Sequence, residues 1–217
     1  MKTRSRLNPL AKAAIAGIVV GLFAALSLAP SNAIDPNPQL ESATVFYNQS
    51  RALPAFSLQD HHATAFSPER LSGRWSVVFL GYTHCPDVCP VTLGHLRTMK
   101  GMLPDALRDE LDVVFVSVDP ERDSLDHLKK YVTFFDEKFL GVTGSPQELG
   151  LLAKGISGLF HVDEHEPGNK TYLVDHSSHI AIINPLGRFH GIFSYPHEPE
   201  VMAREFQTIV AAHNGDS

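Results

Sequence analysis

Two nearly continuous apolar runs in the middle of the chain are separated by a segment of helical character. The runs Trp75–Tyr82 and Leu111–Val118 lack the alternation of a half-exposed strand, and this pattern is typical of strands covered on both faces. Val91–Met102 lies between them and is expected to be a helix. Leu125–Phe135 is expected to be a second helix, and Phe139–Thr143 a short strand. This order predicts strands that alternate with helices.

Shorter patterns on either side complete the predicted domain. Ser145-Pro146-Gln147-Glu148 combines a capping serine, a proline suited to the first helical position and the glutamate of a capping box, and it predicts a helix start. The other expected elements are an N-terminal hairpin, two later pairs of strands and a closing amphipathic helix: Ala55–Leu58 with Thr64–Phe66, Gly158–Val162 with Thr171–Val174, His179–Asn184 with Arg188–Phe193, and Glu200–Ala212. Together these elements indicate one α/β domain with a mixed sheet flanked by helices.

An apolar run near the N-terminus predicts export of the rest of the chain. Ala13–Ala29 holds 17 apolar or small residues, follows a basic stretch and is closed by Pro30. Such a segment is a membrane anchor or a secretory signal, and Ser31-Asn32-Ala33 offers a cleavage site, so both alternatives stay open. The anchored form would hold the body in the periplasm or an equivalent compartment, whereas cleavage would release it as a soluble protein.

We therefore expect three parts along the chain. Residues 1–33 form the basic N-terminus with the anchor or signal segment, residues 34–52 form a tether with scattered prolines, and residues 53–217 form the α/β domain.

Composition and charge exclude two classes of protein. The 217 residues are 43% hydrophobic and 19% charged, which fits a folded protein rather than a disordered one. The formal charge is -6 although the first twelve residues carry four positive charges and no acid, so the remaining chain is more acidic than the whole. An acidic body disfavours nucleic-acid binding, which relies on basic surfaces.

The chain has two cysteines, Cys85 and Cys89, placed between the strand Trp75–Tyr82 and the helix that follows. In α/β folds this end of a strand carries reactive groups, and the helix N-terminus is expected to lower the pKa of a thiol. Residues four apart project from nearly the same helical face, so the sulfurs are expected to converge. A disulfide across so short a loop stabilises by only about 2 kcal/mol. A redox dithiol and a metal site are the stronger alternatives, and the three intervening residues leave room for a metal ion.

A third metal ligand is expected from the twelve histidines of the chain. His176 follows a predicted strand, in a loop that can lie at the same end of the sheet as the cysteines; the alternative is a solvated loop histidine. His84 is a rival, but its adjacency to Cys85 makes binding of the same ion awkward. Asp175 either orients the site or stabilises a turn.

Several other side chains are weaker candidates. Four further histidines are expected to be solvated surface residues rather than a second metal patch: His161, His165, His190 and His197. Met99 and Met102 are three apart on a predicted helix, which is typical of core residues rather than thioether ligands. Asp119–Asp123 is expected to cap the helix after it.

The donor set indicates the metal. Two thiolates and one imidazole without a fourth strong ligand favour a soft ion of low coordination number, above all Cu(I), with Cu(II) as the second oxidation state considered. Zinc stays an alternative, although it normally takes a fourth ligand.

The sequence resembles the Sco/SenC family of copper-binding, thioredoxin-like assembly proteins. Three segments carry the resemblance in order: Phe79–Pro90 (FLGYTHCPDVCP), Val118–Asp123 (VDPERD) and Val174–His176 (VDH). The likeness extends from about Pro54 to the final helix, which is essentially the whole body.

The resemblance implies a thioredoxin-like fold with Cys85, Cys89 and His176 as copper ligands, and a disulfide between the cysteines when copper is absent. Family members help to build the dinuclear copper centre of cytochrome c oxidase, either by passing copper or by reducing the target cysteines. The implied partner is the copper-centre subunit of that oxidase or another copper protein, with the body tethered to the membrane through residues 13–29.

Three hypotheses follow. The first is a membrane-tethered copper chaperone for oxidase assembly, and the second is a thiol-disulfide oxidoreductase in which Cys85 attacks a target disulfide. The third is a peroxidase-like enzyme on a related fold, for which the residues give no specific support.

Overall fold

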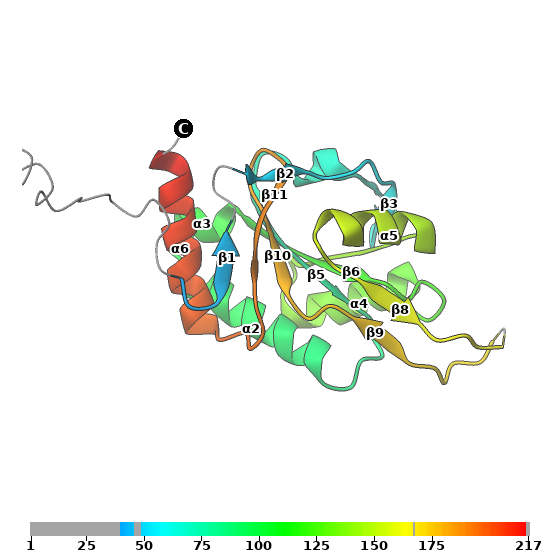
Figure 1. The fold of residues 1–217 in the computed structure, drawn as a ribbon. Helices are drawn as coiled ribbons and strands as arrows, with labels where there is room; N and C mark the ends of the chain where they lie inside the picture. Colours follow the sequence, from blue (N-terminus) through cyan, green and yellow to red (C-terminus); the bar gives the residue numbers. More distant parts are fainter. Residues whose placement is uncertain (1–39, 46–48, 167, 216–217) are drawn as a thin grey trace, which may run out of the picture. The chain divides into compact units, whose positions relative to one another are not determined.

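The computed structural model of the chain describes residues 40–45, 49–166 and 168–215. Its strands are β1 (Ala43–Val45), β2 (Arg51–Ala52), β3 (Leu58–Asp60), β4 (Ala65–Phe66), β5 (Trp75–Gly81), β6 (Leu111–Ser117), β7 (Leu140–Thr143), β8 (Phe160–Val162), β9 (Val174–His176), β10 (Ile180–Ile183) and β11 (Arg188–Phe193). Most of them form a mixed sheet in the order β1-β11-β10-β5-β6-β7-β3-β4, in which β2 also pairs with β11 (Figure 1). Strands β8 and β9 form a separate two-stranded sheet.

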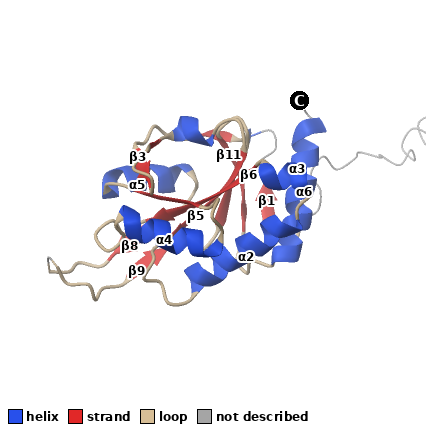
Figure 2. Cartoon of the chain, turned by 180° about the vertical axis from the view of Figure 1, so that it is seen from behind, coloured by secondary structure: helices blue, strands red, loops and turns tan. Residues whose placement is uncertain are grey.

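Helices cover both faces of the mixed sheet. They are α2 (Val88–Met102), α3 (Asp105–Asp109), α4 (Leu125–Phe135), α5 (Pro146–Gly155), α6 (Pro199–Gly215) and the 3-10 helix η2 (Pro68–Leu71). The buried side chains of α2, α4 and α6 belong to one core layer, and those of α5 belong to the other. Figure 2 shows α2 and α4 next to each other on the first of these faces.

Strand β5 explains how the two core layers are joined. All of its residues are buried, and alternate side chains point to opposite faces. Val77 and Phe79 pack in the layer of α2, α4 and α6, whereas Val78 and Leu80 pack in the layer of α5. The absence of a polar face in the sequence therefore reflects burial on both sides, and the predicted α/β fold with a mixed sheet is confirmed.

The centre of the sheet is parallel, and this positions the chemistry. Strand β5 pairs with β6 in parallel from Trp75 opposite Leu111 to Gly81 opposite Ser117. The loops that follow both strands therefore leave the same edge of the sheet. The first loop carries Cys85 and leads into Cys89 in the first turn of α2, and the second loop carries the VDPERD segment.

Helix starts agree with the sequence in part. Helix α4 spans the predicted residues, whereas α2 begins three residues earlier than expected, at Val88. At α5, the Ser145 hydroxyl accepts a hydrogen bond from the Glu148 N–H at 3.3 Å, as a cap should. The Glu148 carboxylate does not complete a capping box, because it accepts a hydrogen bond from the Ser57 N–H at 2.6 Å. It connects the helix to the N-terminal hairpin of β3 and β4 instead.

The structure corrects two expectations and adds one helix. The strand expected at 171–174 lies at 174–176, so His176 ends a strand and does not lie in a loop. The cap of α4 is Ser124, whose side chain accepts from the His127 N–H, and not the 119–123 segment. The added helix, α3, carries no buried residue, so no pattern of apolar residues in the sequence predicts it.

The N-terminal part of the sequence is described only in places. Strands β1 and β2 fall within residues 34–52, the expected tether, and both pair with β11. The apolar run at 13–29 lies outside the described residues. Among the helices that the structure does describe, none combines the length and apolar character needed to cross a membrane.

Candidate metal centre

The two cysteines meet at the N-terminus of α2. Asp87 occupies the N-cap position but its side chain makes no capping hydrogen bond. The Cys89 N–H, in the first turn, instead donates to the Cys85 sulfur at 3.4 Å. Cys85 lies in the loop and is half-buried, Cys89 is fully buried, and both are free thiols. The expected convergence of the sulfurs is confirmed, because the two sulfur atoms lie within 4.8 Å of each other.

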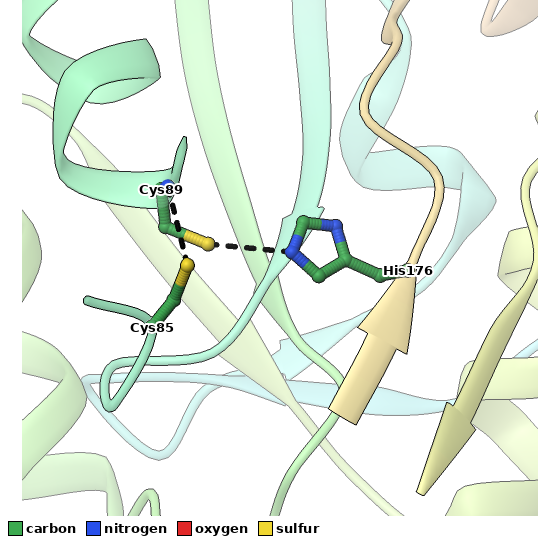
Figure 3. Close-up of side chains that lie close together, drawn as sticks. All are labelled: Cys85, Cys89 and His176. Atoms are coloured by element: carbon green, nitrogen blue, oxygen red, sulfur yellow. Dashed lines mark hydrogen bonds between the residues drawn. The ribbon is translucent and has the colours of Figure 1, made fainter. Parts of the chain in front are cut away.

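His176 reaches the same point from β9. Its Nε2 lies 3.4 Å from the Cys89 sulfur, and Figure 3 shows the ring facing the two thiols. The ring is held edge-on between Phe79 and Tyr82, at centroid distances of 5.8 Å and 6.0 Å. The three ligand atoms all lie within 4.8 Å of one another. The structure therefore brings together the three residues that the sequence analysis predicts as ligands.

The backbone fixes the tautomer of His176. Its Nδ1 is 3.1 Å from the Ser177 carbonyl oxygen, which only accepts hydrogen bonds, so Nδ1 carries the proton. The Nε2 lone pair is then directed at the Cys89 sulfur, as a metal ligand requires. Asp175, which the sequence analysis considers as an orienting residue, is exposed and lies opposite His161 in the antiparallel pair of β8 and β9. The Ser177 carbonyl does the orienting.

Burial sets the protonation of the site. Loss of solvent raises the pKa of the Cys89 thiol, and the Tyr82 backbone N–H, which favours the thiolate, offsets this only in part. Burial likewise lowers the pKa of His176 below its ordinary value of 6.5. The expectation that the helix terminus lowers the thiol pKa is therefore wrong for Cys89. Without a metal, this corner of the site holds a neutral thiol beside a neutral imidazole.

A buried carboxylate holds the cysteine loop. Asp123, only 1% exposed, accepts from the Thr83 N–H at 2.8 Å, from the Thr83 hydroxyl at 2.5 Å and from the Ser117 hydroxyl at 2.6 Å. These bonds connect the loop after β5 to the end of β6 and to the start of α4. Because a carboxylate oxygen is a strong acceptor and the Asp123 side chain is buried, the loop is fixed two residues before Cys85.

A buried ion pair holds the strand that carries His176. Arg122 is paired with Asp119, and their side chains are 4% and 2% exposed. The Arg122 guanidinium lies 3.8 Å above the ring of Tyr172 and 5.3 Å from the ring of Tyr82, and it donates to the Tyr172 carbonyl at 3.1 Å. The Tyr172 hydroxyl donates to Asp119 at 2.6 Å. This cluster connects the segment leading into β9 with the loop before the cysteines.

The remaining candidates lie elsewhere. His84 does not belong to the Cys–Cys–His group, and its Nδ1 is 3.4 Å from Asp123. Of the four histidines expected on the surface, His161 is exposed and His165 is partly buried beside Glu121. His190 and His197 are 0% and 3% exposed, so the expectation is wrong for these two. Met99 is buried in the core as expected, and Met102 is 45% exposed.

The donor chemistry fits a soft metal ion. Two sulfurs and one correctly oriented imidazole nitrogen converge, and no fourth histidine, cysteine or acid joins this group among the described residues. Such a set suits Cu(I) better than Zn(II), which normally completes a tetrahedron. Sequence and fold thus define a class: a thioredoxin-like domain with a Cys–Cys–His group at the edge of its sheet.

Comparison with known proteins gives the family. The family model described as SCO1/SenC matches residues 47–211, and the chain belongs to this family. A relative described as a putative copper-binding protein of Stutzerimonas stutzeri is 37% identical over 168 residues, which cover 77% of this chain and 81% of the relative. Protein SCO2 of Saccharomyces cerevisiae mitochondria is 34% identical over 62% of this chain, and the match spans only 44% of that relative's length.

Solved structures give the same result. The copper-bound ScoI of Arabidopsis thaliana is 30% identical, with a TM-score of 0.66, over 73% of this chain and 97% of the other. The copper-bound yeast Sco1 is 27% identical, with a TM-score of 0.69, over 74% of this chain and 89% of the other. The thioredoxin-like fold expected from the resemblance is confirmed.

We predict that Gly81→Ala damages both the core and the metal centre. A Cβ at this position would lie 2.5 Å from the Phe115 ring and 2.9 Å from the Cys89 sulfur. Because Phe115 is fully buried, the clash is expected to cost about 1–3 kcal/mol of unfolding free energy, measured by urea titration.

The matched control is Gly94→Ala on α2, where an added Cβ meets nothing within 4 Å. This change should raise stability by about 0.5–1 kcal/mol through helix propensity. A Gly81→Ala protein as stable as the wild type would contradict the tight approach of Cys89 to β5.

Proposed function

We propose that this protein binds one copper ion through Cys85, Cys89 and His176 and delivers it to the copper-centre subunit of cytochrome c oxidase or to another copper protein. The observation that carries the proposal is the convergence of these three ligand atoms within 4.8 Å. They come from a loop, a helix terminus and a strand, so only the folded chain assembles them.

The family supports copper as the ion. A relative is described as copper-binding, and two structural neighbours hold copper. The chain spans less than half of the yeast mitochondrial relative, so the oxidase partner is part of the proposal. We further propose that residues 13–29 anchor the protein, with its body in the periplasm or an equivalent compartment; a cleaved signal is the alternative.

The two sulfurs differ in a way that suits delivery. Cys89 and His176 are held by the core and by aromatic rings, whereas Cys85 is half-buried in a loop. An incoming thiolate from a partner can therefore approach the ion from the Cys85 side while the buried ligands still hold it. Ligand exchange of this kind transfers copper without releasing a free ion.

The free, closely spaced thiols favour a second candidate function, reduction of a disulfide in the copper-binding target. The Cys85 thiolate would attack the target disulfide, forming a mixed disulfide and releasing one target thiolate. Cys89 would pass its proton to the released target thiolate and attack the Cys85 sulfur, leaving a Cys85–Cys89 disulfide, one target thiol and one target thiolate that takes up a proton from solvent. This step needs both cysteines and does not need His176.

The two functions are separated by one set of variants. In anaerobic competition with a Cu(I) chelator, the reduced full chain should hold one copper tightly. Cys85→Ser, Cys89→Ser and His176→Ala should each weaken binding by at least about 100-fold, because even loss of an outer-sphere partner costs 10–100-fold. The control His161→Ala removes an exposed histidine and should bind as the wild type does.

Thiol exchange with a disulfide peptide from a copper centre is the second readout. If His176→Ala abolishes tight copper binding but spares exchange, the ligand assignment holds. Stoichiometric tight copper in His176→Ala would overturn it. Fast exchange by a wild-type protein that does not compete for Cu(I) would favour the reductase instead.

Copper affinity should rise with pH. Binding displaces the Cys89 proton, and burial raises the pKa of this thiol, so the proton is present throughout the neutral range. Each displaced thiol proton gives about a tenfold increase in affinity per pH unit. Because burial lowers the pKa of His176, protonation of the imidazole should not change the slope of log affinity against pH near 6.5, the ordinary pKa of this side chain.

Competition titrations between pH 6 and 8 measure this slope. A pH-independent affinity would contradict a buried, protonated Cys89 as a ligand.

A further inference from the structure

A second group of potential metal ligands lies beside the cysteine loop. We propose that His84, Asp123 and His127 form a separate site for one divalent transition-metal ion, with Cu(II) preferred. The ligand atoms of these three residues all lie within 4.8 Å of one another. The group shares no residue with the Cys–Cys–His group, so the proposal goes beyond the proposed function.

A loop, the segment before a helix and the first turn of that helix position the group. His84 lies in the loop after β5, directly before Cys85, and Asp123 lies just before the cap of α4. His127 lies in the first turn of α4, where its backbone N–H is fixed by the hydrogen bond to Ser124 at 3.3 Å. The bonds from Thr83 to Asp123 hold the loop and the helix start together. The fold therefore positions the backbones of both His84 and His127, and the two side chains do not meet at random on the surface.

The buried carboxylate keeps one acceptor position free on the histidine side. The Oδ2 atom of Asp123 accepts from the Thr83 N–H and from the Ser117 hydroxyl, which uses both of its lone pairs. The Oδ1 atom accepts from the Thr83 hydroxyl and has capacity for one more partner. Nδ1 of His84 is 3.4 Å from this Oδ1 atom and 3.2 Å from the Thr83 hydroxyl oxygen. A metal ion can use that remaining position without breaking any bond that holds the loop.

The two imidazoles can close on an ion because they face solvent. The rings of His84 and His127 are stacked with centroids 5.6 Å apart and an interplanar angle of 22°. Both residues are exposed, so their side chains can rotate while Asp123 stays in place. Metal–ligand bonds of about 2.0–2.2 Å need donor atoms roughly 3–3.5 Å apart, which is a small movement from the present spacing.

The donor atoms of His84, Asp123 and His127 favour a different ion from the one that the two thiols favour. Two imidazole nitrogens and a carboxylate oxygen suit divalent copper, zinc or nickel, and the Irving–Williams order places Cu(II) first among these. The soft Cu(I) ion gains little from such ligands. The chain would thus carry a nitrogen–oxygen site for Cu(II) next to a sulfur site for Cu(I), and the two are linked by the peptide bond between His84 and Cys85.

The test uses the full chain without its thiol site. In the background Cys85→Ser/Cys89→Ser/His176→Ala, one equivalent of Cu(II) is added in competition with a weak chelator. We expect one tight ion whose electron paramagnetic resonance spectrum shows coupling to two imidazole nitrogens. Adding His84→Gln or His127→Gln should weaken binding by at least about 100-fold and remove one nitrogen from the coupling. His161→Gln is the matched control and should change neither.

Each outcome decides the proposal. Equal Cu(II) affinity in the His84→Gln, His127→Gln and His161→Gln variants would overturn it. If circular dichroism shows that the triple background has lost its fold, Cys85→Ser/Cys89→Ser with His176 retained replaces it, because a single remaining imidazole is a weak ligand. Failure here leaves Cu(I) binding by the thiols untouched, so it is distinguishable from failure of the proposed function.

Discussion

The carboxylate of Asp123 is the interaction on which the geometry of the site depends. Parallel pairing of β5 with β6 brings two loops to one edge of the sheet, but it does not by itself order them. Asp123 does so by accepting three hydrogen bonds from Thr83 and Ser117 with a side chain that is itself buried. An unpaired charge there would be costly, so the loop conformation that supplies all three donors is strongly favoured. The position of Cys85 follows from that conformation.

Two effects act on the thiols in opposite directions, and burial prevails at Cys89. The N-terminus of a helix stabilises a thiolate by about 0.3–1 kcal/mol in exposed settings, and by up to about 2 kcal/mol in partly buried ones. Removing a full charge from water costs several kcal/mol even after the protein relaxes. Cys89 is fully buried, so its pKa rises despite the helix. A metal ion reverses this balance because its own charge replaces the lost solvation, and the site therefore favours a bound cation over a free thiolate.

Local patterns in the sequence were sufficient for some of these features and not for others. The strand at β5, the helix at 125–135 and the convergence of the cysteines depend on contacts between near neighbours, and the sequence predicts them. The strand that presents His176 pairs across a long turn with β8, so its residues could not be fixed from local propensity. The roles of Asp123 and Arg122 depend on partners up to 50 positions away, and their motif indicated only a helix cap. The resemblance to a family implies the ligand residues, but it does not imply the roles of Asp123 and Arg122 in holding them in place.

The proposed third ligand, His176, comes from outside the main sheet, and this would separate the two chemistries proposed for the thiols. β9 belongs to a two-stranded sheet with β8, and the segment leading into it is held by the stacking of Arg122 on Tyr172. The cysteines instead lie on the central β5–α2 connection, which the core and the hydrogen bonds from Thr83 to Asp123 fix. A shift of the β8–β9 pair would therefore withdraw the imidazole and leave the sulfurs in place. In the proposed functions, metal affinity would depend on the docking of this small sheet, whereas dithiol exchange would not require it.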